Sequence, residues 1–142
     1  ESVRYLAAHY DFIFLDGFTP DTNPELWTID FLSKLKDRLK PDGLLASYCG
    51  AFPFKGALLK LGFHLYESKP FGRRKGGTVA ALDANPVLPP LPEKEILIAT
   101  KSTAGTPYRD PLLRWSREEI LRDRVEHVAA LRTRGMPKWY KN

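Results

Sequence analysis

Short apolar runs divide the first half of the chain into regular elements. Residues 10–15 form a nearly continuous apolar run rich in β-forming side chains, which predicts a strand buried on both faces. Residues 44–48 predict a second buried strand, and residues 63–68 alternate apolar and polar side chains, as a strand with one exposed face does. Residues 78–82 predict one more short strand.

The segments between these strands have the pattern of amphipathic helices. Two helix starts are present, at the Asn-Pro pair of residues 23–24 and at Thr28, and apolar side chains then share one helical face over residues 31–39. A second helix is expected at residues 53–61, followed by Gly62, which tolerates the left-handed backbone that ends many helices. Helical connections predict parallel strands with right-handed crossovers, and the short loop 69–77 allows a terminal antiparallel hairpin. The predicted fold class is therefore α/β.

The second half of the chain has a different composition. Four prolines in residues 83–95 predict a stiff, extended linker rather than a packed element, and residues 96–99 predict a short strand. Ser116 and Glu119 have the spacing of a capping box at the start of a helix, and the end of the chain is basic and aromatic. We therefore expect three parts: a globular part, a proline-rich linker and a basic extension with one helix (residues 1–82, 83–95 and 96–142).

Composition excludes several classes of protein. Apolar residues make up 43% of the 142 residues, and no apolar run approaches the roughly 18 residues that span a bilayer, so no membrane partner is expected. The single cysteine, Cys49, excludes a disulfide framework and fits a cytoplasmic location. The three histidines have no ligand-like spacing, so no metal site is predicted. The sequence predicts no particular oligomeric state.

Asp16 is the first candidate for chemistry. A carboxylate at the carboxyl end of a buried parallel strand lies where open α/β sheets bind their ligands. Gly17 allows a sharp turn, and Phe18 places a flat apolar surface beside the acid. The same pattern also fits an aspartate that only caps the next turn, and by itself the pattern favours neither interpretation.

Two basic segments are candidates for binding RNA. Arg73, Arg74 and Lys75 lie between glycines, and no acid occurs between Ser68 and Leu82. Such a loop can contact phosphates or simply be a solvated hairpin loop. Residues 114–142 hold eight arginines and lysines against four acids, which fits either a second RNA-facing surface or an ordinary solvated helix face.

A longer motif runs through the Asp16 segment. The stretch DGFTP at residues 16–20, followed by NPELW at 23–27, resembles the signature D-[GA]-F-[STA]-P-x-x-N-P-[ED]-[LM]-W. This signature is found in the methyltransferase part of the tRNA 5-methylaminomethyl-2-thiouridine biosynthesis enzyme and in its stand-alone relatives. The similarity extends over residues 10–82, through the segments 39–48, 61–63 and 72–75, and residues 106–111 resemble a tail of the stand-alone members.

The resemblance implies a Rossmann-like class I methyltransferase that uses S-adenosylmethionine and acts on the aminomethyl group of a tRNA wobble uridine. It implies that Asp16 is catalytic and that Asp16, Gly17 and Phe18 contact the cofactor. The expected contacts to substrate come from the rest of the motif and from the basic loop (Pro20, Trp27, Arg73, Arg74 and Lys75). For Trp27, stacking on a base competes with the more usual place of such a tryptophan in the core.

One part of such an enzyme has no counterpart in the sequence. A class I methyltransferase normally begins with a strand, a glycine-rich turn and a helix that hold the cofactor, and no G-x-G-x-G pattern occurs here. We therefore expect the C-terminal half of the methyltransferase sheet, with a cofactor-binding half upstream. The alternative is a non-catalytic, RNA-binding remnant of such an enzyme.

Overall fold

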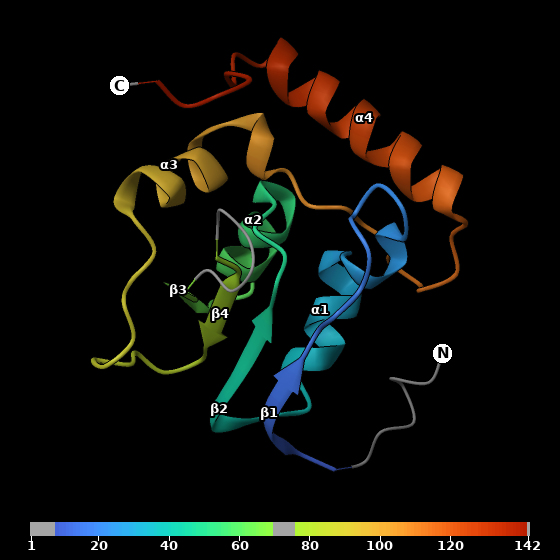
Figure 1. Cartoon of the computed structure of the whole chain (residues 1–142). Helices are drawn as coiled ribbons and strands as arrows, with labels where there is room; N and C mark the ends of the chain where they lie inside the picture. Colours follow the sequence, from blue (N-terminus) through green and yellow to red (C-terminus); the bar gives the residue numbers. More distant parts are fainter. Residues whose placement is uncertain (1–7, 70–75, 142) are drawn as a thin grey trace.

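The structure, a computed structural model, describes residues 8–69 and 76–141. In this part of the chain, four strands form one sheet with helices packed around it (Figure 1). The strands are β1 (Tyr10–Phe14), β2 (Leu39–Ser47), β3 (His64–Glu67) and β4 (Thr78–Ala81). The helices are α1 (Ile29–Lys36), α2 (Phe52–Lys60), α3 (Glu93–Lys101) and α4 (Arg117–Thr133), with 3-10 turns at Pro24–Leu26 and Thr103–Gly105.

The sheet has the order β1-β2-β4-β3. β1 pairs in parallel with β2, whereas β4 pairs antiparallel with both β2 and β3. β3 therefore runs in the same direction as β2, as the helical crossover predicts, but β4 is inserted between them. The predicted α/β class with a terminal antiparallel hairpin is confirmed.

Local sequence signals set most helix ends. Thr28 caps α1 by accepting a hydrogen bond from the Phe31 amide at 3.1 Å, and α2 is followed by Gly62 at φ +89°. The capping box of α4 is complete: the Glu119 amide donates to Ser116 Oγ at 3.2 Å, and the Ser116 amide donates to Glu119 Oε2 at 2.6 Å. Both predicted helix starts near Trp27 exist, because a 3-10 turn precedes α1.

Two expectations about the second half are wrong. Residues 96–99 belong to helix α3 and not to a strand, because Pro92 precedes a first turn with Glu93 and Glu95. The proline-rich segment is also not free of packing: Leu91 is buried, and its amide donates to the Leu65 carbonyl in β3 at 3.1 Å. The division into three parts remains a prediction.

The prediction that residues 10–15 are buried on both faces is also wrong for this chain. Tyr10, Phe12 and Phe14 are 38%, 54% and 48% exposed, and only Leu15 is buried. β1 lies at one end of the described sheet, so one of its edges has no strand beside it there. The apolar run thus predicted the strand correctly, but Phe12 and Phe14 share one face of the sheet, and the described residues do not cover that face.

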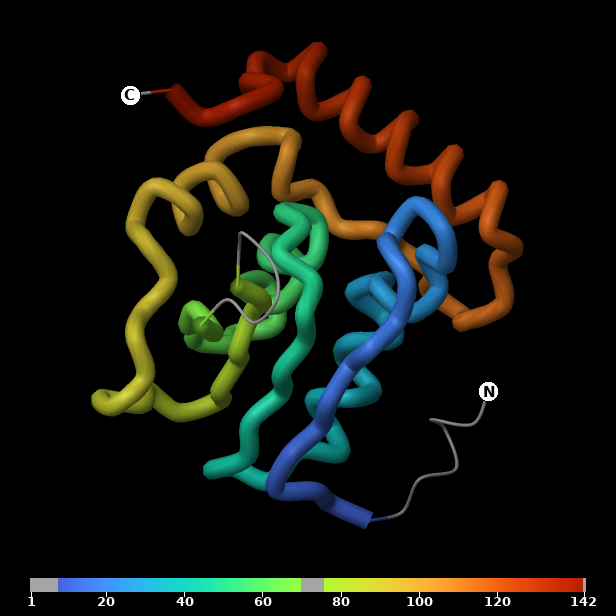
Figure 2. Tube along the Cα trace, in the orientation of Figure 1, coloured from blue at the N-terminus to red at the C-terminus, as the bar shows by residue number. Residues whose placement is uncertain are grey.

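The C-terminal extension packs onto the sheet domain. Ile120 of α4 is fully buried and joins the main hydrophobic core with Trp27, Leu32 and Phe54. Figure 2 shows the C-terminal half of the chain passing over the end of the sheet and beside the loop that follows β1. The Ile29 amide donates to the Tyr108 carbonyl at 2.9 Å, which ties this segment to the start of α1. No helix in the described ranges is long and apolar enough to cross a membrane.

Candidate functional site

A cleft lies at the carboxyl ends of β1 and β2. The two strands end side by side, since the Leu15 amide donates to the Ala46 carbonyl at 2.8 Å. The segments that leave these strands enclose a cavity of about 850 Å³. Its walls are residues 16–23 with Leu26 on the β1 side and residues 47–51 on the β2 side. The topology therefore brings the strand-end segment predicted from the sequence to a single concave site.

Asp16 and Gly17 line this cleft, and the Asp16 side chain is exposed. Among the described residues, no hydrogen bond or ion pair engages its carboxylate. At Gly17, an added Cβ would lie 3.1 Å from Leu26 Cδ1 and 3.2 Å from Trp27 Cζ2, closer than ordinary contacts. A residue without a side chain thus lets the turn after Asp16 lie directly on the 3-10 turn below it.

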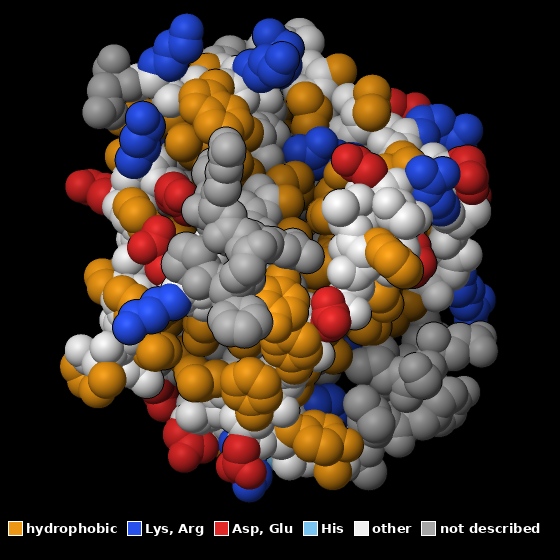
Figure 3. All heavy atoms as spheres, viewed as in Figure 1, with side chains coloured by type: hydrophobic (Ala, Val, Ile, Leu, Met, Phe, Trp, Pro, Cys, Tyr) orange, Lys and Arg blue, Asp and Glu red, His pale blue; other side chains and the backbone are white. Residues whose placement is uncertain are grey.

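Aromatic side chains flank the acid. Phe18 is 77% exposed, and the Phe14 and Tyr48 rings meet edge to face with centroids 5.3 Å apart. Figure 3 shows hydrophobic side chains gathered over β1 and β2 on this face of the molecule. The cleft therefore combines a carboxylate with flat apolar surfaces on which a planar ligand can lie.

Cys49 lines the same cleft but is not set up as a nucleophile. Burial raises the pKa of its thiol above the ordinary value, although the Ala51 amide and Lys55 oppose the shift, so the thiol is neutral near pH 7. Its backbone is well held: the Cys49 carbonyl accepts from Thr78 Oγ1 at 2.8 Å. Cys49 thus shapes the wall between the ends of β2 and β4.

The structure corrects one predicted substrate contact. Trp27 is 1% exposed, and its ring packs edge to face on Phe54 with centroids 5.1 Å apart, so it belongs to the core and has no face for a base. Pro20 does line the cleft, although it is buried. Arg73, Arg74 and Lys75 lie outside the described residues, and their role stays a prediction. The structure also leaves the roles of the other site residues as predictions (Asp16, Gly17, Phe18 and Pro20).

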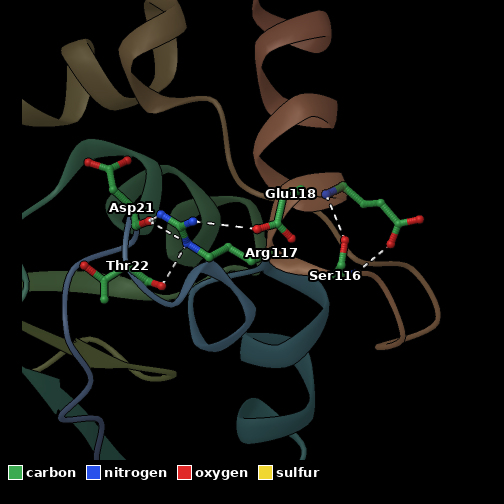
Figure 4. Close-up of polar contacts among 6 residues, drawn as sticks. Asp21, Thr22, Ser116, Arg117 and Glu118 are labelled. Atoms are coloured by element: carbon green, nitrogen blue, oxygen red, sulfur yellow. Dashed lines mark hydrogen bonds and ion pairs between the residues drawn. The ribbon is translucent and has the colours of Figure 1, made fainter.

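The C-terminal extension holds the loop that forms one wall of the cleft. Tyr108 Oη donates to Asp21 Oδ1 at 3.2 Å. Arg117 donates from Nη2 to the Asp21 carbonyl at 2.8 Å and from Nε to the Thr22 carbonyl at 3.1 Å. Figure 4 shows Arg117 reaching from the start of α4 to this loop.

The sequence did not predict that Tyr108 and Arg117 hold this loop. In the sequence, Arg117 is only one charge in a basic segment, whereas in the structure its guanidinium donates to backbone carbonyls.

Arg124 is engaged as well, because its Nε donates to the Thr106 carbonyl at 2.8 Å and its guanidinium lies 5.0 Å from the Tyr108 ring centre. Burial raises the pKa of Tyr108; Asp21 adds to the shift, while Arg124 opposes it. The hydroxyl therefore remains a neutral donor to Asp21.

The donor and acceptor set of the cleft fits S-adenosylmethionine. Asn23 Oδ1 is buried at the wall of the cleft and has no hydrogen-bond partner among residues 8–69 and 76–141. An orphan acceptor of this kind can take an amino or hydroxyl donor, while a carboxylate suits positive charge and exposed rings suit an adenine. In the same ranges, no three acidic, histidine or cysteine side chains gather closely enough to hold a metal ion.

Comparisons with known proteins agree on one family. A sequence model of S-adenosyl-L-methionine-dependent methyltransferases matches residues 1–83. The crystal structure of MnmC2 from Aquifex aeolicus superposes with a TM-score of 0.82 at 37% identity, over 91% of this chain and 42% of that one. This match confirms the methyltransferase-like fold.

Two curated relatives extend this picture. An uncharacterized protein from Methanocaldococcus jannaschii is 34% identical over 87% of this chain and 35% of its own length. The tRNA 5-methylaminomethyl-2-thiouridine biosynthesis bifunctional protein MnmC from Ectopseudomonas mendocina is 33% identical over 61% of this chain and 13% of its own length. The chain thus spans about a third or less of these curated relatives.

Proposed function

We propose a function on the premise that this chain belongs to the S-adenosyl-L-methionine-dependent methyltransferase family that includes MnmC. In this proposal, the cleft is where a methyl group is transferred to the aminomethyl nitrogen of a tRNA wobble uridine. The observation that carries the proposal is the exposed Asp16 carboxylate at the joint carboxyl ends of β1 and β2. The MnmC relative is a tRNA 5-methylaminomethyl-2-thiouridine biosynthesis protein, which supports a tRNA substrate.

The cofactor supplies a methyl group made electrophilic by its positively charged sulfur. To accept this methyl group through its lone pair, the amine nitrogen would have to be neutral and held facing the methyl group. Asp16 accepts a hydrogen bond from the amine N–H and thereby orients the lone pair. As the new nitrogen–carbon bond forms, positive charge develops on nitrogen, and the carboxylate stabilises that charge and accepts the proton. Phe18 and Tyr48 present apolar surface beside this point.

We further propose that the rest of the protein supplies the glycine-rich turn for the cofactor. Support comes from the exposed apolar side chains of Phe12 and Phe14, which share one face of the sheet and which an element packed on that face would cover. Support also comes from the coverage, since the chain spans 42% of the MnmC2 chain that it matches. The tRNA-modifying relative supports a cytoplasmic location in this proposal.

The proposal is tested by replacing Asp16 in the full-length protein that contains this chain. Asp16→Asn keeps the shape but removes the proton acceptor, so the single-turnover rate on tRNA that carries the aminomethyl group should fall by about 10²-fold or more. Binding of the cofactor should weaken less. Asp42→Asn is the matched control, because Asp42 is an exposed acid in the first half of β2, away from the carboxyl end of that strand where the cleft lies.

An unchanged rate in Asp16→Asn would remove Asp16 from the mechanism. Tight tRNA binding by the wild-type protein without any methyl transfer would instead support the alternative, a non-catalytic RNA-binding remnant. Equal losses in Asp16→Asn and Asp42→Asn would mean that general charge, and not the cleft, determines the rate.

A further inference from the structure

A second, smaller hollow lies between the C-terminal tail and helix α3. It has a volume of about 440 Å³ and is lined by apolar and aromatic side chains with two lysines, and no acid lines it (Leu97, Lys101, Pro137, Trp139, Tyr140 and Lys141). Trp139 is 44% exposed, and its neighbour Lys138 is exposed as well. The hollow thus offers an open indole surface beside two lysines.

The tail is fixed in place. The Thr103 amide donates to the Pro137 carbonyl at 2.9 Å, which ties the tail to the turn after α3. The Trp139 ring meets Phe52 edge to face with centroids 5.1 Å apart, and Lys55 Nζ lies 5.1 Å from the centre of the same Phe52 ring. An aromatic side chain held in this way loses little further conformational freedom when a ligand binds.

The hollow is next to the cleft. Phe52 is the first residue of α2 and follows directly on Ala51, which lines the cleft. Because Phe52 contacts Trp139, the hollow lies beside the residue that directly follows the cleft wall. Figure 1 shows the C-terminal tail and α3 at the same end of the molecule as the carboxyl ends of β1 and β2, and Figure 3 shows Lys and Arg side chains beside hydrophobic ones there.

We propose that this hollow binds an unpaired nucleobase of the tRNA next to the nucleotide in the cleft, with the base stacked on Trp139 and the flanking phosphates contacted by lysines (Lys101, Lys138 and Lys141). The inference rests on the proposed function. A wobble nucleotide lies in a single-stranded loop, so its neighbours are bases with free faces. Every base has a flat face that can stack on an indole, and a polyanion suits a rim without acids. A nucleic acid joins a planar base to an anionic phosphate in every nucleotide, whereas an acidic peptide presents a planar ring only where it has an aromatic side chain.

The test measures tRNA binding by the full-length protein at several salt concentrations. Trp139→Ala should weaken binding by about 5- to 150-fold, which corresponds to the loss of one base stacked on an aromatic ring. Trp139→Phe should restore most of the affinity, because it keeps a flat ring. Trp115→Ala is the matched control, since Trp115 is 36% exposed but lies outside the hollow.

Salt dependence separates stacking from charge. Lys138→Ala and Lys141→Ala should each reduce the slope of log Kd against log salt by about one, whereas Trp139→Ala should leave the slope unchanged. Circular dichroism of each variant checks that it is folded.

If Trp139→Ala binds tRNA as tightly as the wild type and Trp115→Ala, while the wild type still methylates tRNA, the inference is overturned and the proposed function stands. Saturation of the hollow by an acidic peptide in competition with tRNA, without dependence on Trp139, would also overturn it. If the wild-type protein neither binds nor methylates tRNA, the proposed function fails and the inference fails with it.

Discussion

Replacing Arg117 tests whether the C-terminal extension positions the cleft. Arg117 is the first residue of α4, where a cation is unfavourable because the helix N-terminus carries partial positive charge. Its place there is explained by its contacts with the Asp21 and Thr22 carbonyls at 2.8 and 3.1 Å. Arg117→Ala should therefore release the loop without weakening the helix itself.

The size of the effect follows from exposure. A hydrogen bond with a charged donor contributes about 1.5–3 kcal/mol when protected from water. The Arg117 side chain is 51% exposed, so we expect about 1–2 kcal/mol for the contacts together. A loss of this size corresponds to a rise of about 5- to 30-fold in local opening of residues 19–23. Because misplaced reacting groups slow chemistry steeply, kcat should fall more than KM rises.

Hydrogen exchange of the backbone amides measures this opening directly. The Thr22 and Asn23 amides, which both donate to the Thr19 carbonyl, should exchange faster in Arg117→Ala. Arg117→Lys should restore part of the protection, since an ammonium group can reach one carbonyl. Arg122→Ala is the control, because Arg122 is an exposed cation on the same helix. Unchanged protection in a folded Arg117→Ala protein would refute the positioning role.

Further predictions concern the extension as a whole. Ile120→Ala should reduce the free energy of unfolding by about 2–5 kcal/mol, because Ile120 is fully buried, whereas Val125→Ala, at a 68% exposed position on the same helix, should change it by less than about 0.5 kcal/mol in chemical denaturation. Equal effects would show that α4 does not share the core. Burial, with Arg109 second, lowers the pKa of His127 below 6.5, so the unfolded chain binds the proton more readily and stability should fall as pH drops through 6.5 and below. His127→Gln should flatten this part of the stability profile, and an unaltered slope would assign it to other groups.

Local patterns account for most of the fold that could be predicted. The strands follow from short apolar runs, and the starts of α1 and α4 follow from Thr28 and Ser116, because capping depends on residues within one helical turn. The position of Asp16 also follows from local sequence, since it comes two residues after the end of β1. These features need no knowledge of the rest of the chain.

Most of the errors concern contacts between distant segments. The exposure of Phe12 depends on what packs on its face of the sheet, and the sequence pattern of a buried strand does not reveal that element. Residues 96–99 give too few positions to separate a helical period from a strand. Trp27 belongs to a recognisable motif, but a motif does not show which way a side chain faces, and here the ring packs on Phe54.

The cleft itself was only half predicted. Its β1 side was identified from the sequence, whereas the residues that fix this side come from far along the chain. Tyr108 and Asp21 are 87 positions apart, and no local spacing connects them. Arg117 carried no signal beyond its charge, although the structure uses its geometry to hold backbone carbonyls.

Nucleoside analysis after methyl transfer tests the central claim most directly. The full-length protein is incubated with isotope-labelled S-adenosylmethionine and tRNA that carries an aminomethyl group on its wobble uridine, and the digested tRNA is separated by chromatography with mass detection. We predict that the label appears as one methyl group on the aminomethyl nitrogen and that Asp16→Asn forms this product at least about 10²-fold more slowly. Label on another nucleoside, or none in a protein that binds both substrates, would contradict the account.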